Sequence, residues 1–413
     1  MDEKNQLLLG IDLGKQASQI TCFDRTEYEA VPLGREINGE MVYEFPMALK
    51  WLKASGTWRF PDQEGDGGEE IILDHLLERF QKTSFEAGGH TFQTEMVLER
   101  YLLKLLSAVT QQFPEQRIKH LVITVHDKTP ELTKLLHQVG KKLNLYPERM
   151  SIQNYRLSYM YYAVSQPKEL WLNNVGLFLF NKEELLYSQI TVDRRTIPWI
   201  VDVTTQNLTN VFDYSMLEEE SVDAQYAFVN IAETAMHKQA VTTLYAFDGE
   251  WAKEALQKLC NGRRVFRGNN IFTKGACYAA RELSGEGKLD QCILLDEDMI
   301  TANVSLRVYH EAQMQDVVLA KAGSLWEEVD ASVDVIPDKE YEIQIAVQDV
   351  IKHQTKIHML SLSGFQGREN KTTRFTVRVR FSNRETAVIT LKDNGFGEIS
   401  PTSNRIWERC IRL

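Results

Sequence analysis

The stretch that most constrains the fold lies at the start of the chain. Residues 7–14, LLLGIDLG, form an apolar run that ends in an aspartate and a glycine, and residues 18–23, SQITCF, form a second β-like segment. A buried strand that delivers Asp12 into a tight glycine turn, followed by another strand, builds a hairpin. The backbone N–H groups of such a turn can point at phosphate oxygens, and a carboxylate can hold hydrated Mg²⁺ beside them. The sequence therefore predicts a phosphate-facing hairpin, with Asp12 binding magnesium through water.

Length and charge limit the class of protein. The 413 residues suggest two or three domains, at roughly 150 residues each. A hydrophobic fraction of 43% and a charged fraction of 25% are typical of globular proteins. The net charge of −11 argues against a nucleic-acid-binding protein, because such proteins depend on basic phosphate contacts.

The cysteines and the N-terminus indicate a cytoplasmic location. The five cysteines are scattered and lack CxxC spacing, which is typical of reduced thiols rather than of disulfides or a zinc site. The first residues, MDEKNQ, are polar and do not form a signal peptide. No apolar run approaches the roughly 18 residues of a membrane span.

Periodicity predicts alternating strands and helices up to about residue 283. A long helix is expected over residues 94–111, whose apolar residues repeat at three and four. Thr129 and Pro130 are typical of an N-cap and a first helical position. The other expected strands are 121–125, 177–180, 185–192, 242–247 and 263–266, and the other helices begin near 130, 224, 250 and 272. Inspection of the sequence finds no internal repeat.

After about residue 283 the period changes from 3.6 to 2. Apolar residues alternate with polar ones in three segments, 304–308, 341–347 and 375–381. Several short two-sided strands separated by turns predict an antiparallel sandwich or sheet. The glycine-rich segment 284–288 is the expected hinge, so the predicted domains are 1–283 and 284–413.

The ordered motifs resemble those of the actin, sugar-kinase and heat-shock-70 ATPase superfamily. GIDLG resembles its first phosphate motif. Residues 248–251, DGEW, and the segment 269–280, NNIFTKGACYAA, resemble the adenosine corner of heat-shock-70 ATPases, and residues 121–145 resemble a chaperone strand and helix. The chain is also similar to an uncharacterised clostridial heat-shock-70-like family with degenerate phosphate motifs.

The resemblance implies a fold and a set of site residues. The fold is α/β, with a two-lobed actin-like (ribonuclease-H-like) nucleotide-binding domain followed by an antiparallel β-rich domain. The cofactors implied are ATP or ADP with Mg²⁺. The residues expected to contact the nucleotide are Gly10, Asp12, Leu13, Gly14, Lys15, Gln16, Gly249, Glu250, Lys274 and Gly275.

The sequence departs from the superfamily at the second phosphate motif. The resemblance calls for a glycine-rich Asp-x-Gly-Gly-Gly-Thr segment after a strand, whereas residues 180–185 read FNKEEL. Acidic side chains repel a γ-phosphate, and phosphoryl transfer needs close positioning and charge neutralisation. We therefore expect at most a weak ATPase.

Two main hypotheses follow, and a third is weaker. The leading one is a chaperone-like protein in which ATP or ADP, bound between two lobes, regulates a C-terminal β domain. The alternative is a pseudo-ATPase scaffold or adaptor with an empty cleft. Either would bind a protein or peptide through the β domain. A sugar or acid kinase would need a catalytic aspartate where Asn181 stands.

Two further groups have both a structural and a functional interpretation. His126 and Asp127 follow a strand end, where a catalytic pair could lie, although such neighbours are usually a loop feature. The tyrosines at positions 155, 159, 161 and 162 could stack on a base, but packing between elements explains them as well.

Overall fold

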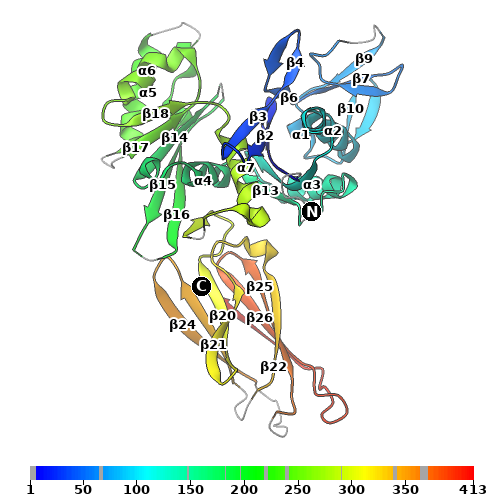
Figure 1. Cartoon of the computed structure of the whole chain (residues 1–413), viewed down its shortest axis with the longest axis vertical. Coiled ribbons are helices and arrows are strands. Elements are labelled where there is room, and N and C mark those ends of the chain that lie inside the picture. Colours follow the sequence, from blue (N-terminus) through cyan, green and yellow to red (C-terminus); the bar gives the residue numbers. More distant parts are fainter. Residues whose placement is uncertain are drawn as a thin grey trace. The chain divides into compact units, whose positions relative to one another are not determined.

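The computed structural model combines α and β structure in two compact units (Figure 1). The first unit contains residues 1–192 and 203–290, and the second contains residues 193–202 and 291–413. The structure describes residues 6–64, 68–146, 148–181, 183–195, 197–217, 222–237, 241–289, 291–337, 342–362 and 371–413. In that described part of the chain, the helices lack the length and apolar character that a bilayer crossing requires.

The first sheet of the first unit is built around the N-terminal hairpin. Its strand order is β13-β12-β1-β2-β3, and β1 is antiparallel to β2 and parallel to β12. The bounds are β1 (Gln6–Leu13), β2 (Ala17–Asp24), β3 (Glu29–Leu33), β12 (Arg117–Val125) and β13 (Met150–Asn154), with β6 (Phe45–Pro46) pairing to β2. The predicted hairpin and the strand over residues 121–125 are confirmed.

Capping residues and apolar periodicity explain where the helices next to the first sheet lie in the sequence. α2 (Thr94–Gln112) buries one apolar stripe in the core, as its spacing predicts. α3 (Pro130–Lys142) begins at the expected cap, because the Leu132 N–H donates to Thr129 Oγ1 at 3.2 Å. α4 (Tyr155–Ser165) follows β13, with Asn154 as its cap.

Residues 34–93 form small sheets that periodicity alone did not predict. They are β4 (Arg35–Ile37) with β5 (Glu40–Val42), β7 (Leu49–Leu52) with β8 (Thr57–Arg59) and β9 (Glu70–Leu73), and β10 (Ser84–Ala87) with β11 (His90–Gln93). α1 (Leu76–Arg79) lies between the last two groups in the sequence. Strands of three or four residues are too short to show a period.

The second sheet repeats the order of the first. It runs β18-β17-β14-β15-β16, with β14 antiparallel to β15 and parallel to β17. The strands are β14 (Asn174–Phe180), β15 (Leu185–Asp193), β16 (Trp199–Asn207), β17 (Val241–Ala246) and β18 (Arg264–Arg267). The α-helices are α5 (Val222–Met236), α6 (Lys253–Leu259) and α7 (Ile271–Arg281). The short helices are η2 (Lys168–Leu170), η3 (Thr209–Val211), η4 (Tyr214–Leu217) and η5 (Glu250–Ala252). Five strands of each sheet therefore share one order, although inspection of the sequence finds no repeat.

Two helices, α4 and α7, pack against each other inside the first unit (Figure 1). A Cβ on Gly275 of α7 would lie 1.9 Å from the Ser158 carbonyl oxygen of α4, and a Cβ on Gly10 of β1 would lie 2.3 Å from two backbone atoms of α7. Both positions therefore require glycine, since a methyl group has no space there.

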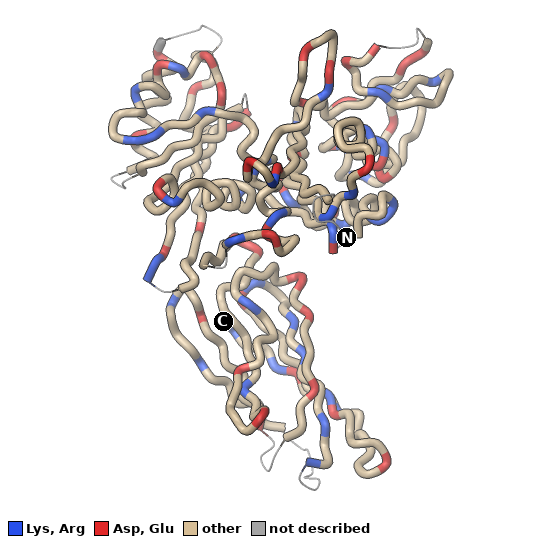
Figure 2. Tube along the Cα trace, in the orientation of Figure 1, with Lys and Arg blue, Asp and Glu red and all other residues tan. Residues whose placement is uncertain are grey.

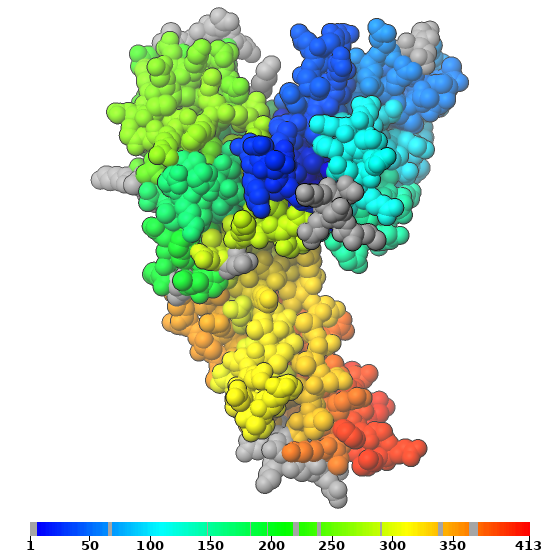
Figure 3. Space-filling model, in the orientation of Figure 1, coloured from blue at the N-terminus to red at the C-terminus, as the bar shows by residue number. Residues whose placement is uncertain are grey.

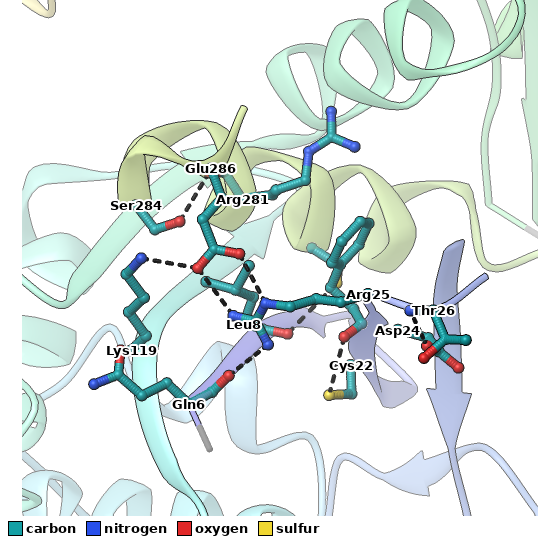
Figure 4. A network of polar contacts seen from close by, with 12 residues as sticks. Gln6, Leu8, Cys22, Asp24, Arg25, Thr26, Lys119, Arg281, Ser284 and Glu286 are labelled. Atoms are coloured by element: carbon teal, nitrogen blue, oxygen red, sulfur yellow. Dashed lines mark hydrogen bonds and ion pairs between the residues drawn. The ribbon is translucent and has the colours of Figure 1, made fainter. Parts of the chain in front are cut away.

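The end of the first unit is fixed by an ionic cluster. Glu286 of η6 (Glu282–Glu286) accepts hydrogen bonds from Arg25 Nε at 2.8 Å and from Lys119 Nζ at 2.8 Å (Figure 4). These cations hold the pKa of Glu286 down to about 2. This cluster ties residue 286 to the first sheet, and the first unit extends to residue 290. The boundary at 283 and 284 stays a prediction.

The second unit consists of two antiparallel four-stranded sheets around one core. The strand orders are β21-β20-β23-β24 and β22-β25-β26-β27, and apolar residues of both enter the core. Residues 199–202 of β16 also belong to this unit and pair with β19 (Cys292–Leu295). The other bounds are β20 (Ala302–His310), β21 (Gln313–Ala320), η7 (Trp326–Glu328), β22 (Asp330–Val335), β23 (Glu342–Asp349), β24 (Gln354–Ser361), β25 (Phe375–Asn383), β26 (Thr386–Asp393) and β27 (Ile406–Arg412).

Candidate functional site

A cleft of about 360 Å³ lies within the first unit, where strand ends of its two sheets converge. The lining comes from residues 12–19, from the strand ends at 126, 177–180 and 247–248, and from the starts of α4 and α7. Figure 3 shows the first unit notched between its blue and light-green segments, which supply two sides of this lining. In this cleft the predicted phosphate-facing hairpin faces residues of the part of the first unit that contains the second sheet.

Asp12 stands at the end of β1 and lines the cleft, although its side chain is only 7% exposed. The Tyr155 hydroxyl donates a hydrogen bond to Asp12 Oδ1 at 2.8 Å. Burial raises the pKa of Asp12 to about 7, and the Tyr155 hydrogen bond and nearby His126 oppose this increase only in part. This carboxyl therefore binds a proton more readily than an exposed aspartate does.

Tyr155 connects the two sides of the cleft through ring contacts. Its ring stacks on Phe272 of α7 with centroids 3.8 Å apart and planes 9° apart. His126 approaches the same ring edge-on at 5.3 Å. The packing interpretation is confirmed for this tyrosine, because its ring already has two aromatic partners.

The turn between β1 and β2 has no space for a side chain at its first residue. A Cβ on Gly14 would lie 2.5 Å from the Ala17 carbonyl oxygen. Lys15 and Gln16 follow as exposed residues and both line the cleft. The cleft lining therefore includes four of the predicted site residues, Asp12, Gly14, Lys15 and Gln16.

The turn between β14 and β15 is closed by an asparagine. Asn181 Oδ1 accepts hydrogen bonds from the backbone N–H groups of Glu183 at 2.8 Å and Glu184 at 2.9 Å. Asn181 Nδ2 in turn donates to Glu184 Oε1 at 2.9 Å. All three residues line the cleft, and Lys182 lies outside the described residues. This turn therefore presents carboxylates to the cleft where the resemblance calls for glycines.

His126 links the end of β12 to this second turn. Its Nε2 lies 3.3 Å from Glu184 Oε1, and its Nδ1 lies 2.9 Å from Asp127 Oδ1. The Glu184 carboxylate raises the pKa of His126, and His126 lowers the pKa of Glu184. The histidine next to Asp127 is therefore part of an ion pair across the cleft, which its sequence context alone did not indicate.

Six of the ten predicted site residues do not line the cleft. Gly10 and Gly275 pack against backbone, as described above, and Leu13 is buried in the core. Gly249 precedes Trp251, whose ring packs on Phe180 at 4.9 Å. The remaining two, Glu250 and Lys274, are also absent from the lining, and the Glu250 side chain is 83% exposed. The neighbouring Asp248, Asn269 and Phe272 line the cleft instead.

The cleft also contains residues that the sequence did not single out. Glu44, His75 and Glu78 reach it from the small sheets and α1. Their segments have no period or motif, so no signal in the sequence could have found them. Only the tertiary structure brings them to the hairpin.

The charge of the lining is unfavourable for phosphate. It includes six carboxylic residues (Asp12, Glu44, Glu78, Glu183, Glu184 and Asp248), against Lys15 and the two histidines His75 and His126. Asp12 is the predicted magnesium ligand, and its carboxylate already accepts the Tyr155 hydrogen bond. The residues present therefore fit Mg²⁺-nucleotide poorly.

Comparisons with known proteins give matches to two family models, both of unknown function. A model described as "Family of unknown function (DUF5716) C-terminal" matches residues 34–297. A second, described as "Domain of unknown function (DUF8552)", matches residues 299–413. No curated protein matches the chain. The junction between the two matched regions, at 297 and 299, lies close to the division between the units.

Proposed function

The chain belongs to the family of unknown function DUF5716, and we propose that it is a pseudo-ATPase scaffold. In this proposal the first unit has a two-lobed actin-like fold that has lost phosphoryl transfer. The second unit binds a protein or peptide partner. The proposal is the second of the two main hypotheses that the sequence raised.

The duplicated topology supports the actin-like part of the proposal. Each sheet has a central strand with an antiparallel hairpin partner on one side and two parallel strands on the other. In the first half α4 follows β13, and in the second half α7 follows β18. These two helices pack together. Two such lobes around a cleft are what the superfamily resemblance implies.

The observation that carries the proposal is the chemistry of the β14–β15 turn. A phosphate site here would use glycine amides that point at the γ-phosphate. Instead, the Asn181 side chain takes two of the turn's amides, and Glu184 pairs with His126 across the cleft. The amides are therefore already satisfied, and the carboxylates repel the anion that they would bind.

The turn between β1 and β2 favours a second candidate, the chaperone-like protein regulated by nucleotide. Asp12, Gly14 and Lys15 lie together on the cleft, as a first phosphate motif requires. The Lys15 ammonium is a point charge that could contact a phosphate. In this second candidate ATP or ADP binds without efficient hydrolysis, because only one of two phosphate turns is suitable.

The thermal midpoint with and without millimolar Mg·ATP and Mg·ADP distinguishes the two candidates. A ligand that binds only the native state stabilises it by RT ln(1 + [L]/Kd), about 2.7 kcal/mol at a hundredfold excess over Kd. We expect no shift for the wild-type chain. A shift of several degrees that disappears in Asp12→Ala would refute the scaffold and establish the nucleotide-regulated protein.

A double variant tests the reason for the expected lack of binding. Glu183→Gly/Glu184→Thr removes both carboxylates of the second turn, and we expect it to gain a nucleotide-dependent shift. The matched control is Glu27→Gln/Glu29→Gln, which removes two exposed carboxylates outside the cleft lining and should gain none. If neither variant gains a shift, charge repulsion by this turn is not the cause.

A further inference from the structure

A second concave surface of the first unit lies away from the cleft, at the C-terminal end of α2. This groove of about 670 Å³ is bounded by the last turns of α2, the start of β12 and the segment after α3. Its apolar lining consists of Leu7, Leu103, Leu106, Val109, Phe113, Ile118, Leu143 and Leu145. The groove shares no residue with the cleft lining.

Most of the apolar groove lining on α2 also contacts the core, and Leu103 does not. The buried stripe of α2, which includes Val97, Tyr101 and Leu105, packs in the core. Leu103 and Leu106 lie on an adjacent stripe that faces the groove, and Leu103 is 41% exposed. Leu103 is therefore the exposed apolar residue of the groove, beside side chains that lie in the core or pack against it.

The polar part of the lining has one sign of charge. It contains Arg117 and Arg149 and no carboxylate, in a chain whose net charge is −11. Acidic and basic residues are interspersed over much of the chain (Figure 2), so this lining is an exception. Arg149 donates a hydrogen bond to the Ile118 carbonyl, and among the described residues neither arginine has an ion pair with a carboxylate.

We propose that this groove binds an amphipathic helix of a partner protein, with carboxylates at the end that meets the two arginines. The groove's floor along α2 runs from Leu103 to Thr110, which corresponds to about 10 Å, or two helical turns. Two turns accommodate apolar anchors at i, i+3 and i+7, which is how a helix binds in an apolar groove. The arginines fix the direction of the helix, because they attract its acidic end.

This site differs from the partner site of the proposed function. It lies in the first unit, and it requires neither nucleotide nor the β domain. Its failure would therefore leave the scaffold proposal standing, and a nucleotide-dependent shift would leave the groove proposal standing.

Fluorescence anisotropy of the full chain with two synthetic helical peptides tests the proposal. Both peptides carry leucines at i, i+3 and i+7; one ends in two glutamates and the other in two lysines. We expect saturable binding of the acidic peptide and at least tenfold weaker binding of the basic one. The variant Arg117→Glu/Arg149→Glu should reverse this preference, while Arg100→Glu/Lys104→Glu, on α2 outside the lining, should not.

A second pair of variants tests the apolar part of the groove. Leu103→Gln should weaken binding of the acidic peptide at least fivefold, whereas Gln111→Ala, at an exposed α2 position outside the lining, should leave it unchanged. Thermal midpoints confirm that each variant is folded. The proposal is overturned by a lack of saturable binding at millimolar peptide, by equal binding of both peptides, or by self-association of the chain that Leu103→Gln abolishes, since a second copy would then cover the groove.

Discussion

The two hairpin turns of the first unit occupy equivalent positions in sheets of the same order but differ in chemistry. Leu13 pairs with Ser18 and Phe180 pairs with Leu185, so each turn has four residues, 14–17 and 181–184. The first turn reads GKQA and the second NKEE. The first needs glycine for its shape, and the second is closed by an asparagine side chain. The two turns therefore have the same length and the same place in the strand order, but they differ in how they are closed and in charge.

The largest difference in stability between the two sheets is expected when the glycine in the first strand of each is replaced by alanine. A Cβ on Gly10 would lie 2.3 Å from backbone atoms of α7, whereas one on Gly176 would meet only side-chain atoms, at 3.0 Å or more. We expect Gly10→Ala to destabilise the first unit by about 3 kcal/mol, and Gly176→Ala by about 1 kcal/mol or less. Chemical denaturation measures both, and equal losses would show that the two halves pack alike.

The next effect concerns Asp12, which has no acidic counterpart in the second sheet, where Leu179 holds the equivalent position. The folded pKa of Asp12 is raised from 3.8 to about 7, so the folded state binds the proton more tightly than the unfolded state does. Stability from this group therefore falls as pH rises, by about 2 kcal/mol between pH 5 and 7. Asp12→Asn should remove this pH dependence, as measured by urea denaturation at several pH values. Parallel pH profiles for the two proteins would contradict the assignment.

The smallest effect is expected from the ion pair between His126 and Glu184. The raised pKa of His126 means that its contribution is complete below its unfolded value near 6.5 and is lost as pH rises through the folded value. The lowered pKa of Glu184 means that its contribution is complete above about 4.5 and is lost as pH falls. The pair should therefore stabilise most between pH 5 and 6.

A double-mutant cycle with His126→Gln and Glu184→Gln measures this pair. We expect a coupling energy of about 1 kcal/mol at pH 5.5 that decreases by pH 8. A coupling energy independent of pH would show that the histidine stays neutral. In that case the second turn is held to the first half by packing rather than by charge.

Much of the fold of the first unit was predictable from local signals. The apolar runs at 7–14, 121–125 and 177–180 are strands, and the periodic segment 94–111 is a helix within one residue of its bounds. The change of period near residue 283 correctly indicated the antiparallel β-rich region. The apolar runs are visible because both faces of these strands are buried. The periodic segments are visible because burial on one face imposes a period of 2 or 3.6 on the sequence.

The candidate site was only partly predictable. The hairpin residues Asp12, Gly14, Lys15 and Gln16 line the cleft, but Gly275 and Gly10 turned out to be packing positions. A glycine that approaches a ligand and a glycine that approaches a helix look the same in a sequence, because both simply lack a side chain. Which neighbour each one meets depends on residues far away along the chain.

The sequence by itself determined the longer strands and helices of the first unit, the Thr129 cap and the position of the Asp12 turn, because these depend on residues within a few positions of each other. Only the tertiary structure decided that Tyr155 bonds Asp12, that Glu184 pairs with His126, and that Arg117 and Arg149 share a groove with α2. These contacts join residues that are distant in the chain, and their charges and burial take effect only when the sheets bring them together.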